Sequence, residues 1–172
     1  GSLKKRGFNF ITFKDLAKGA RVAKPIIFTF DDGYEDNYSN LLPLLKKHQA
    51  KAVIYCLGDR TVQSNIWDEK LGEPRANLMS DSQIKECHES GLVEIASHGL
   101  KHQHLSSLND KEAREEFELS KLNLENLIND KVISFAYPYG DYKKREEILA
   151  YEAGYDFAIG TVNGPLKLTD NY

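Results

Sequence analysis

The sequence predicts an α/β fold with parallel strands, as a sheet or a (β/α) barrel, whose active site lies at the carboxyl ends of the strands. Short apolar runs alternate with amphipathic helical segments along the chain, which favours right-handed crossovers between parallel strands. Polar residues directly follow three of these runs: Asp31 with Asp32, then His98, then Tyr137–Gly140. Ligands bind at the carboxyl ends of parallel strands, so we expect these three segments to meet at one rim.

Size and composition are those of an ordinary globular domain. The 172 residues are enough for one domain with a sizeable core, and the contents of 41% hydrophobic and 28% charged residues are typical values. A net charge of -3 gives no electrostatic reason to expect nucleic acid or an anionic membrane as a partner. No apolar run approaches the roughly 20 residues of a membrane span. The two cysteines, Cys56 and Cys87, are expected to be buried thiols.

The first strand is predicted over residues 26–30, after Pro25, where β-branched and aromatic residues indicate a fully buried strand. Residues 1–24 precede it and have a mixed composition. We interpret them as a lead-in segment that begins with a tag remnant, Gly1-Ser2.

A helix is predicted from about residue 36 to residue 48, with Pro43 as an awkward interior residue that kinks it. The second strand follows at residues 51–57. Residues 58–79 form a long irregular connection that holds Trp67, the only tryptophan. A connection of that length inside a compact domain is more often functional than filler.

The next helix begins with a capping box, Ser80 with Gln83, and ends at Gly91. The third strand is predicted over residues 92–96. It leads directly to His98.

The longest helix begins with a second capping box, Asn109 with Glu112. Its buried stripe is expected to consist of Ala113, Phe117, Ser120, Leu124, Leu127 and Ile128. A strand over residues 132–136, a helix over 143–153 and a strand over 155–159 complete the predicted elements.

Two imidazoles and a carboxylate are the donor set of a catalytic zinc site that keeps one position open. Asp31 and Asp32 have a simpler interpretation as a turn or helix cap, and His98 and His102 as ordinary surface or core histidines. Each pattern alone is weak. Their coincidence at consecutive strand ends favours a metal site.

These residues lie in three motifs that resemble those of the polysaccharide deacetylase domain (NodB-like, carbohydrate esterase family 4). The motifs are Thr29–Gly33, the histidine pair in Ser97–His102, and Phe135–Gly140, and the resemblance spans roughly residues 24–160. The Tyr-Pro-Tyr-Gly form of the third motif is similar to the branch acting on poly-N-acetylglucosamine. The resemblance implies a distorted (β/α) barrel and a catalytic domain over residues 25–172, which we expect to be truncated and the barrel incomplete.

Roles follow from the resemblance position by position. Asp31 corresponds to the catalytic base. Asp32, His98 and His102 correspond to the ligands of Zn²⁺ or another divalent ion such as Co²⁺ or Ni²⁺. The backbone N–H of Tyr139 corresponds to the donor that stabilises the oxyanion.

The sequence departs from the family pattern in two places. The third motif often carries an arginine that pairs with the base, and Ala136 stands at that position. The family's general acid is a histidine from a late strand, or in the poly-N-acetylglucosamine branch from a segment before the first motif, and we find neither segment. His104 and His48 are the unassigned histidines nearby, with a surface loop as the default interpretation of His104.

Trp67, Tyr137 and Pro138 are predicted to contact substrate, because an aromatic ring covers the apolar face of a sugar well. Core packing is an equally good interpretation of Trp67.

The resemblance implies a metal-dependent hydrolase that removes N-acetyl groups from a chitin-like or poly-N-acetylglucosamine-like polysaccharide. The alternatives are an O-acetyl esterase acting on glycans such as xylan and a non-catalytic glycan-binding module. The partner would be a polysaccharide or oligosaccharide. An extracellular, cell-envelope or periplasmic location is expected from the family.

Overall fold

The computed structural model describes residues 2–69 and 71–161, and its centre is a five-stranded parallel sheet in the order β3-β4-β5-β6-β7. The strands are β3 (Thr29–Phe30), β4 (Ala52–Cys56), β5 (Val93–Ser97), β6 (Ser134–Ala136) and β7 (Phe157–Ile159). Sequential parallel order with helical crossovers is the topology of a (β/α) barrel. The predicted fold class, a distorted and incomplete barrel, is confirmed. Residues 162–172, the end of the predicted catalytic domain, lie outside the described residues.

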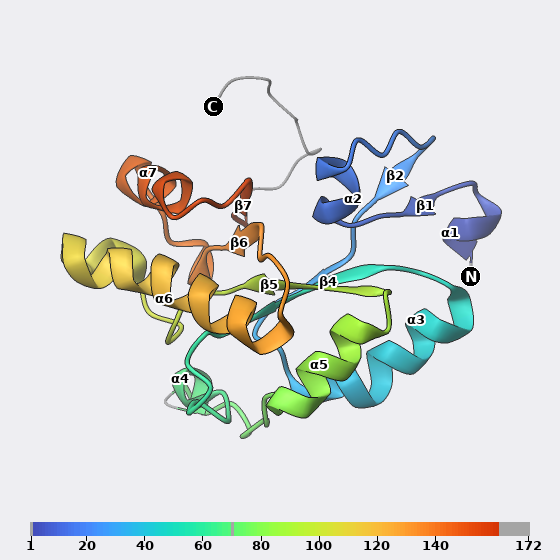
Figure 1. Cartoon of the computed structure of the whole chain (residues 1–172). Coiled ribbons are helices and arrows are strands. Elements are labelled where there is room, and N and C mark those ends of the chain that lie inside the picture. Colours follow the sequence, from blue (N-terminus) through green and yellow to red (C-terminus); the bar gives the residue numbers. More distant parts are fainter. Residues whose placement is uncertain (1, 70, 162–172) are drawn as a thin grey trace.

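Helices cover one face of the sheet and the N-terminal segment covers the other (Figure 1). The outer layer consists of α3 (Leu42–His48), α5 (Asp81–Glu89), α6 (Asp110–Ile128) and α7 (Lys144–Glu152). The chain starts with α1 (Ser2–Lys5), β1 (Asn9–Phe10), α2 (Phe13–Ala17) and β2 (Pro25–Ile26). Phe13 of α2 packs against Val53, Tyr55 and Ala96 on the inner face. The inner face is therefore covered by chain from before the first motif.

The prediction of one fully buried strand over residues 26–30 is wrong. Pro25–Ile26 pairs with β1 in a separate two-stranded sheet, and Thr29–Phe30 pairs with β4. Thr29 is exposed, and the apolar residues of this stretch are only half-buried. The physical reason is position, since β3 lies at the edge of the five-stranded sheet and is packed less completely than the central strands.

The helix predicted near residues 36–48 is present, with its irregularity in its first half. A π-helical segment, Asn37–Leu41, runs into α3, and Pro43 lies in the first turn of α3. Proline has no N–H to donate to the turn before it. The wider π turn that precedes Pro43 accommodates this missing hydrogen bond.

The two capping boxes that the sequence predicts are both formed, at Ser80 for α5 and at Asn109 for α6. The buried residues of α6 include five of the predicted stripe, and Leu127 is partly buried against the same core. Glu116 is also buried in this stripe, where the sequence predicts only apolar and small residues. Cys56 and Cys87 are free and buried, as expected.

In the described part of the long connection over residues 58–79 there is a short helix, α4 (Ile66–Glu69). Two isolated antiparallel bridges fasten it, Tyr34 with Leu78 and Ser64 with Asn77. The connection therefore begins and ends beside the carboxyl ends of β3 and β4. Over the described ranges, none of the helices combines the length and the apolarity needed to cross a bilayer.

We predict that Gly58→Ala destabilises the fold by about 1–3 kcal/mol, the usual cost of overpacking. A Cβ atom at Gly58 would lie 2.3 Å from the Cα of Ser120 in α6, and backbone atoms cannot rotate away. The free energy of unfolding, measured with denaturant, tests this. Stability equal to that of the wild type would show that α6 can move away from β4 without cost.

We also predict that Glu94→Gln changes how stability depends on pH. Glu94 is buried, accepts the Lys14 backbone N–H at 2.8 Å, and has a pKa that burial raises above the ordinary range. Because the pKa of Glu94 is raised in the folded state, its contribution to stability is complete below the pKa of an unfolded-state glutamate, about 4.3. It is lost as the pH rises through the folded pKa.

The glutamine variant stays neutral, so its stability relative to wild type should increase from about pH 4 to pH 7. The gain should be about 1.4 kcal/mol per unit of pKa difference. Denaturant unfolding of both proteins at the two pH values measures it. A constant difference would contradict the raised pKa.

Candidate active site

Three of the predicted site residues converge at the carboxyl ends of β3 and β5. Asp32, His98 and His102 each offer one donor atom, and these atoms all lie within 4.8 Å of one another. Oδ1 of Asp32 lies 3.4 Å from Nε2 of His98 and 3.2 Å from Nε2 of His102. The structure thus brings together the three residues that correspond to metal ligands in the resembling family.

The hydrogen bonding of His98 shows which of its atoms is free to bind a cation. Nδ1 of His98 lies 2.8 Å from the carbonyl oxygen of Ala136. A carbonyl only accepts, so Nδ1 carries the proton and Nε2 presents its lone pair toward Asp32. Burial also lowers the pKa of His98, which favours the neutral ring that a metal ligand requires.

The donor set therefore fits a divalent cation. In the described part of the chain, Oδ1 of Asp32 is buried without a hydrogen-bond partner. A lone pair on Nε2 of His98 facing a carboxylate oxygen repels it unless a cation lies between them. Tetrahedral zinc with bonds of about 2.0–2.1 Å would place neighbouring ligand atoms about 3.3 Å apart, close to the two distances measured from Asp32.

The two adjacent carboxylates lie in different electrostatic environments. Burial by itself would raise the pKa of Asp32, but the contacts with His102 and Tyr34 hold it below its usual range. Asp31 instead has a raised pKa, chiefly because of desolvation by surrounding protein, with the Asp32 charge adding to the effect. Although protein surrounds its carboxyl group, Asp31 as a whole residue is exposed at the rim. Asp32 is thus suited to stay ionised as a ligand, and Asp31 to accept a proton.

Three residues of this rim have a strained backbone. Asp32 (φ 67°), His102 (φ 56°) and Tyr139 (φ 58°) all occupy the left-handed region. Each such residue costs roughly 1–2 kcal/mol compared with an ordinary conformation. Strain of this kind persists only where surrounding contacts enforce it, and it is typical of functional sites.

Aromatic rings line the site around His102. The Trp67 ring stacks on the His102 imidazole at 4.2 Å, and Tyr139 approaches His102 edge-on at 4.5 Å. The His104 ring in turn stacks on Tyr139 at 3.9 Å. Trp67 lies in α4, so the long 58–79 connection supplies one wall of the site.

Tyr34 and Asp68 are site residues that our sequence reasoning missed. The Tyr34 hydroxyl donates to Oδ2 of Asp68 at 3.3 Å, and it also interacts with Asp32. Burial, followed by the charges of Asp32 and Asp68, raises the pKa of Tyr34, so its proton stays in place. The available signals were the position of Tyr34 one residue after the first motif and of Asp68 next to Trp67.

The predicted substrate contacts of Tyr137 and Pro138 need correction. Both residues are buried, and the Tyr137 ring stacks on Tyr142 at 4.3 Å inside the core. Strand β6 directs the Tyr137 side chain toward the helical layer, where it packs against Phe117. Among the residues of the third motif, Tyr139 has its ring exposed at the rim.

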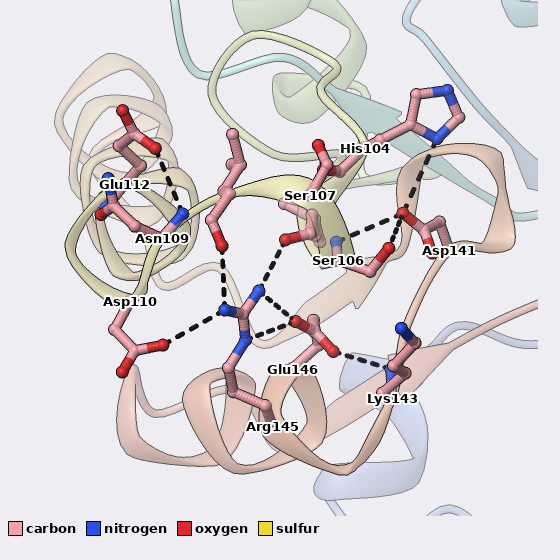
Figure 2. A network of polar contacts seen from close by, with 12 residues as sticks. His104, Ser106, Ser107, Asn109, Asp110, Glu112, Asp141, Lys143, Arg145 and Glu146 are labelled. Atoms are coloured by element: carbon pink, nitrogen blue, oxygen red, sulfur yellow. Dashed lines mark hydrogen bonds and ion pairs between the residues drawn. The ribbon is translucent and has the colours of Figure 1, made fainter.

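The segment after His102 is held by a network of polar contacts with the start of α7 (Figure 2). Asp141 accepts hydrogen bonds from the backbone N–H of Ser106 at 3.2 Å and from its hydroxyl at 2.8 Å. The same carboxylate lies 3.6 Å from Nδ1 of His104. Arg145 pairs with the buried Glu146 at 2.6 Å. These contacts fix the loop that presents His104 beside Tyr139.

Comparison with known proteins assigns the chain to a family. The family model for polysaccharide deacetylase matches residues 18–158. A putative polysaccharide deacetylase of Bacillus subtilis, YxkH, is 30% identical over 141 residues, covering 82% of this chain and 46% of that protein. The poly-beta-1,6-N-acetyl-D-glucosamine N-deacetylase of Staphylococcus aureus is 26% identical over 156 residues, covering 88% and 49%.

The fold is shared with solved structures as well. The Streptococcus pyogenes deacetylase PplD, solved in complex with acetate, superposes with a TM-score of 0.77 at 26% identity, covering 94% of this chain and 69% of that one. The chain spans about half the length of the curated relatives it matches. From its three motifs, its fold and the extent of the family match, this chain belongs to the polysaccharide deacetylase family.

Proposed function

We propose that this chain is the catalytic part of a metal-dependent hydrolase that removes N-acetyl groups from an amino-sugar polysaccharide. The observation that carries the proposal is the arrangement of His98 and His102 around one buried oxygen of Asp32, beside the exposed residue Asp31. The activity named for the S. aureus relative supports a poly-N-acetylglucosamine-like substrate. We assign the catalytic domain to residues 25–172, as the motifs suggest.

Asp32, His98 and His102 would hold the divalent ion, with zinc first and cobalt or nickel as substitutes. When bound, such an ion supplies Lewis-acid chemistry, polarising the acetyl carbonyl and acidifying water. Asp31 accepts the proton of the attacking water, and its raised pKa makes it a better base than an ordinary aspartate. The backbone N–H of Tyr139 donates to the developing oxyanion.

The substrate would lie against the aromatic side of the rim. Trp67 keeps its predicted role, and the exposed rings of Tyr139 and His104 replace the buried Tyr137 and Pro138 as contacts for sugar. Polymeric amino sugars are found outside the cytoplasm, so we propose an extracellular, cell-envelope or periplasmic place of action.

We predict that Asp31→Asn and Asp32→Asn separate catalysis from metal binding. Asp31→Asn should keep zinc affinity nearly unchanged and lower deacetylation by about 10²–10⁴, the usual effect of losing a positioned base. Asp32→Asn should lose zinc, because a neutral amide replaces the charged ligand. Calorimetric zinc titration and acetate release measure the two effects. Equal loss of zinc in both variants would contradict this division of roles.

We further predict zinc-dependent release of acetate from β-1,6-linked N-acetylglucosamine oligomers in preference to acetylated xylan. Acetate is quantified for both substrates with the wild type, and Asp32→Asn serves as the inactive control. Faster release from xylan would establish the O-acetyl esterase alternative instead. Zinc binding without release from either substrate would favour a glycan-binding module.

A further inference from the structure

Glu116 is a buried carboxylate on α6 that faces the loop between the two histidines. The residue is 3% exposed. Its Oε2 atom accepts the backbone N–H of Leu100 at 2.7 Å and that of Lys101 at 3.0 Å. In the part of the chain that the structure describes, these two N–H groups are its hydrogen-bond partners. A helix of the outer layer thus reaches directly into the His98–His102 loop.

The two hydrogen bonds to this carboxylate require an unusual backbone conformation in the loop. Two successive N–H groups must point at a single oxygen, which ordinary extended backbone does not allow because successive N–H groups alternate in direction. Gly99 supplies the necessary turn with a φ of 79°, and a Cβ atom there would lie 2.9 Å from Oε2 of Glu116. Burial raises the pKa of Glu116, and the two backbone donors oppose that shift. Burying a carboxylate costs free energy, so a functional reason is expected for the place of Glu116 against the loop.

Further contacts hold the same loop from both sides. One turn along α6, the Ser120 hydroxyl donates to the Gly99 carbonyl at 2.8 Å. From the end of β4, the Gly58 N–H donates to the same carbonyl at 2.9 Å. His102 follows Lys101 directly and occupies the left-handed region. Its orientation toward Asp32 therefore depends on how the three preceding residues are held.

We propose that Glu116 is a positioning residue for the metal centre, acting through the loop backbone to aim His98 and His102 at Asp32. The inference rests on the proposed metal-dependent function. Glu116 lies outside all three motifs, and its role is to hold the ligand side chains in place before the cation binds. Pre-formation of ligands by surrounding hydrogen bonds is typically worth 10–100-fold in metal affinity.

The test is zinc affinity, measured by competition with a chelator in the metal-free protein. Glu116→Ala should weaken zinc binding about 10–100-fold. Glu116→Gln should lose less than about fivefold, because its amide oxygen can still accept both N–H groups and only the charge is lost. Glu115→Ala, an exposed glutamate one position earlier on the same helix, is the matched control and should bind like the wild type. Cobalt substitution adds a spectroscopic readout of ligand geometry, which should change in Glu116→Ala and not in Glu116→Gln.

Denaturant unfolding of each metal-free variant separates loss of folding from loss of affinity. If Glu116→Ala does not fold, Glu116→Asp takes its place, because it keeps the charge but shortens the reach, and it should bind zinc more weakly than Glu116→Gln.

Zinc affinity of Glu116→Ala within twofold of the wild type would overturn the inference and leave the proposed function intact. Equal losses in the alanine and glutamine variants would also overturn it. Failure of the wild type to bind zinc would overturn both.

Discussion

The buried oxygen of Asp32, faced by two imidazole nitrogens, is the constraint on which the rest of this rim depends. The lone pair on Nε2 of His98 and Oδ1 of Asp32 do not stay 3.4 Å apart without either a cation or a scaffold that holds them. The scaffold is visible here. The Ala136 carbonyl fixes the His98 ring, and Trp67 stacks on the His102 ring. The Tyr34 hydroxyl donates to Asp68 and also interacts with Asp32. Each donor is thus held by a different element of the fold.

The topology explains why such distant segments can act together. In a sheet built in sequential parallel order, every strand delivers its next residue to the same rim. The register between β5 and β6 determines which of their atoms meet at this rim. Ser97 pairs with Phe135, so His98 and Ala136 leave their strands at the same level, and the Ala136 carbonyl meets Nδ1 of His98. The inner face of the sheet is covered by α2, whose Phe13 packs against Val53, Tyr55 and Ala96 (Figure 1).

Local rules predicted much of this molecule, and tertiary packing accounts for what they missed. Capping boxes at Ser80 and Asn109 depend on neighbouring residues alone, so they were predictable. The split strand was not, because an apolar run cannot show whether its sheet position is central or at the edge. Tyr137 was misplaced because a motif names residues without their side-chain directions. Glu116 was overlooked because acids are presumed exposed, although its spacing from Ala113 and Ser120 fits the buried face of the helix.

The alanine at position 136 has a consequence for the pKa of Asp31. An arginine at this position, as in many members of the resembling family, would place a permanent cation near Asp31 and lower its pKa. In this chain burial and the Asp32 charge raise the pKa of Asp31, and the alanine side chain carries no charge to oppose them. A carboxylate with a raised pKa holds an abstracted proton more firmly. The position still serves the site through its backbone, because the Ala136 carbonyl sets the tautomer of His98. The alanine therefore keeps the backbone contact that orients His98 and adds no permanent cation beside Asp31.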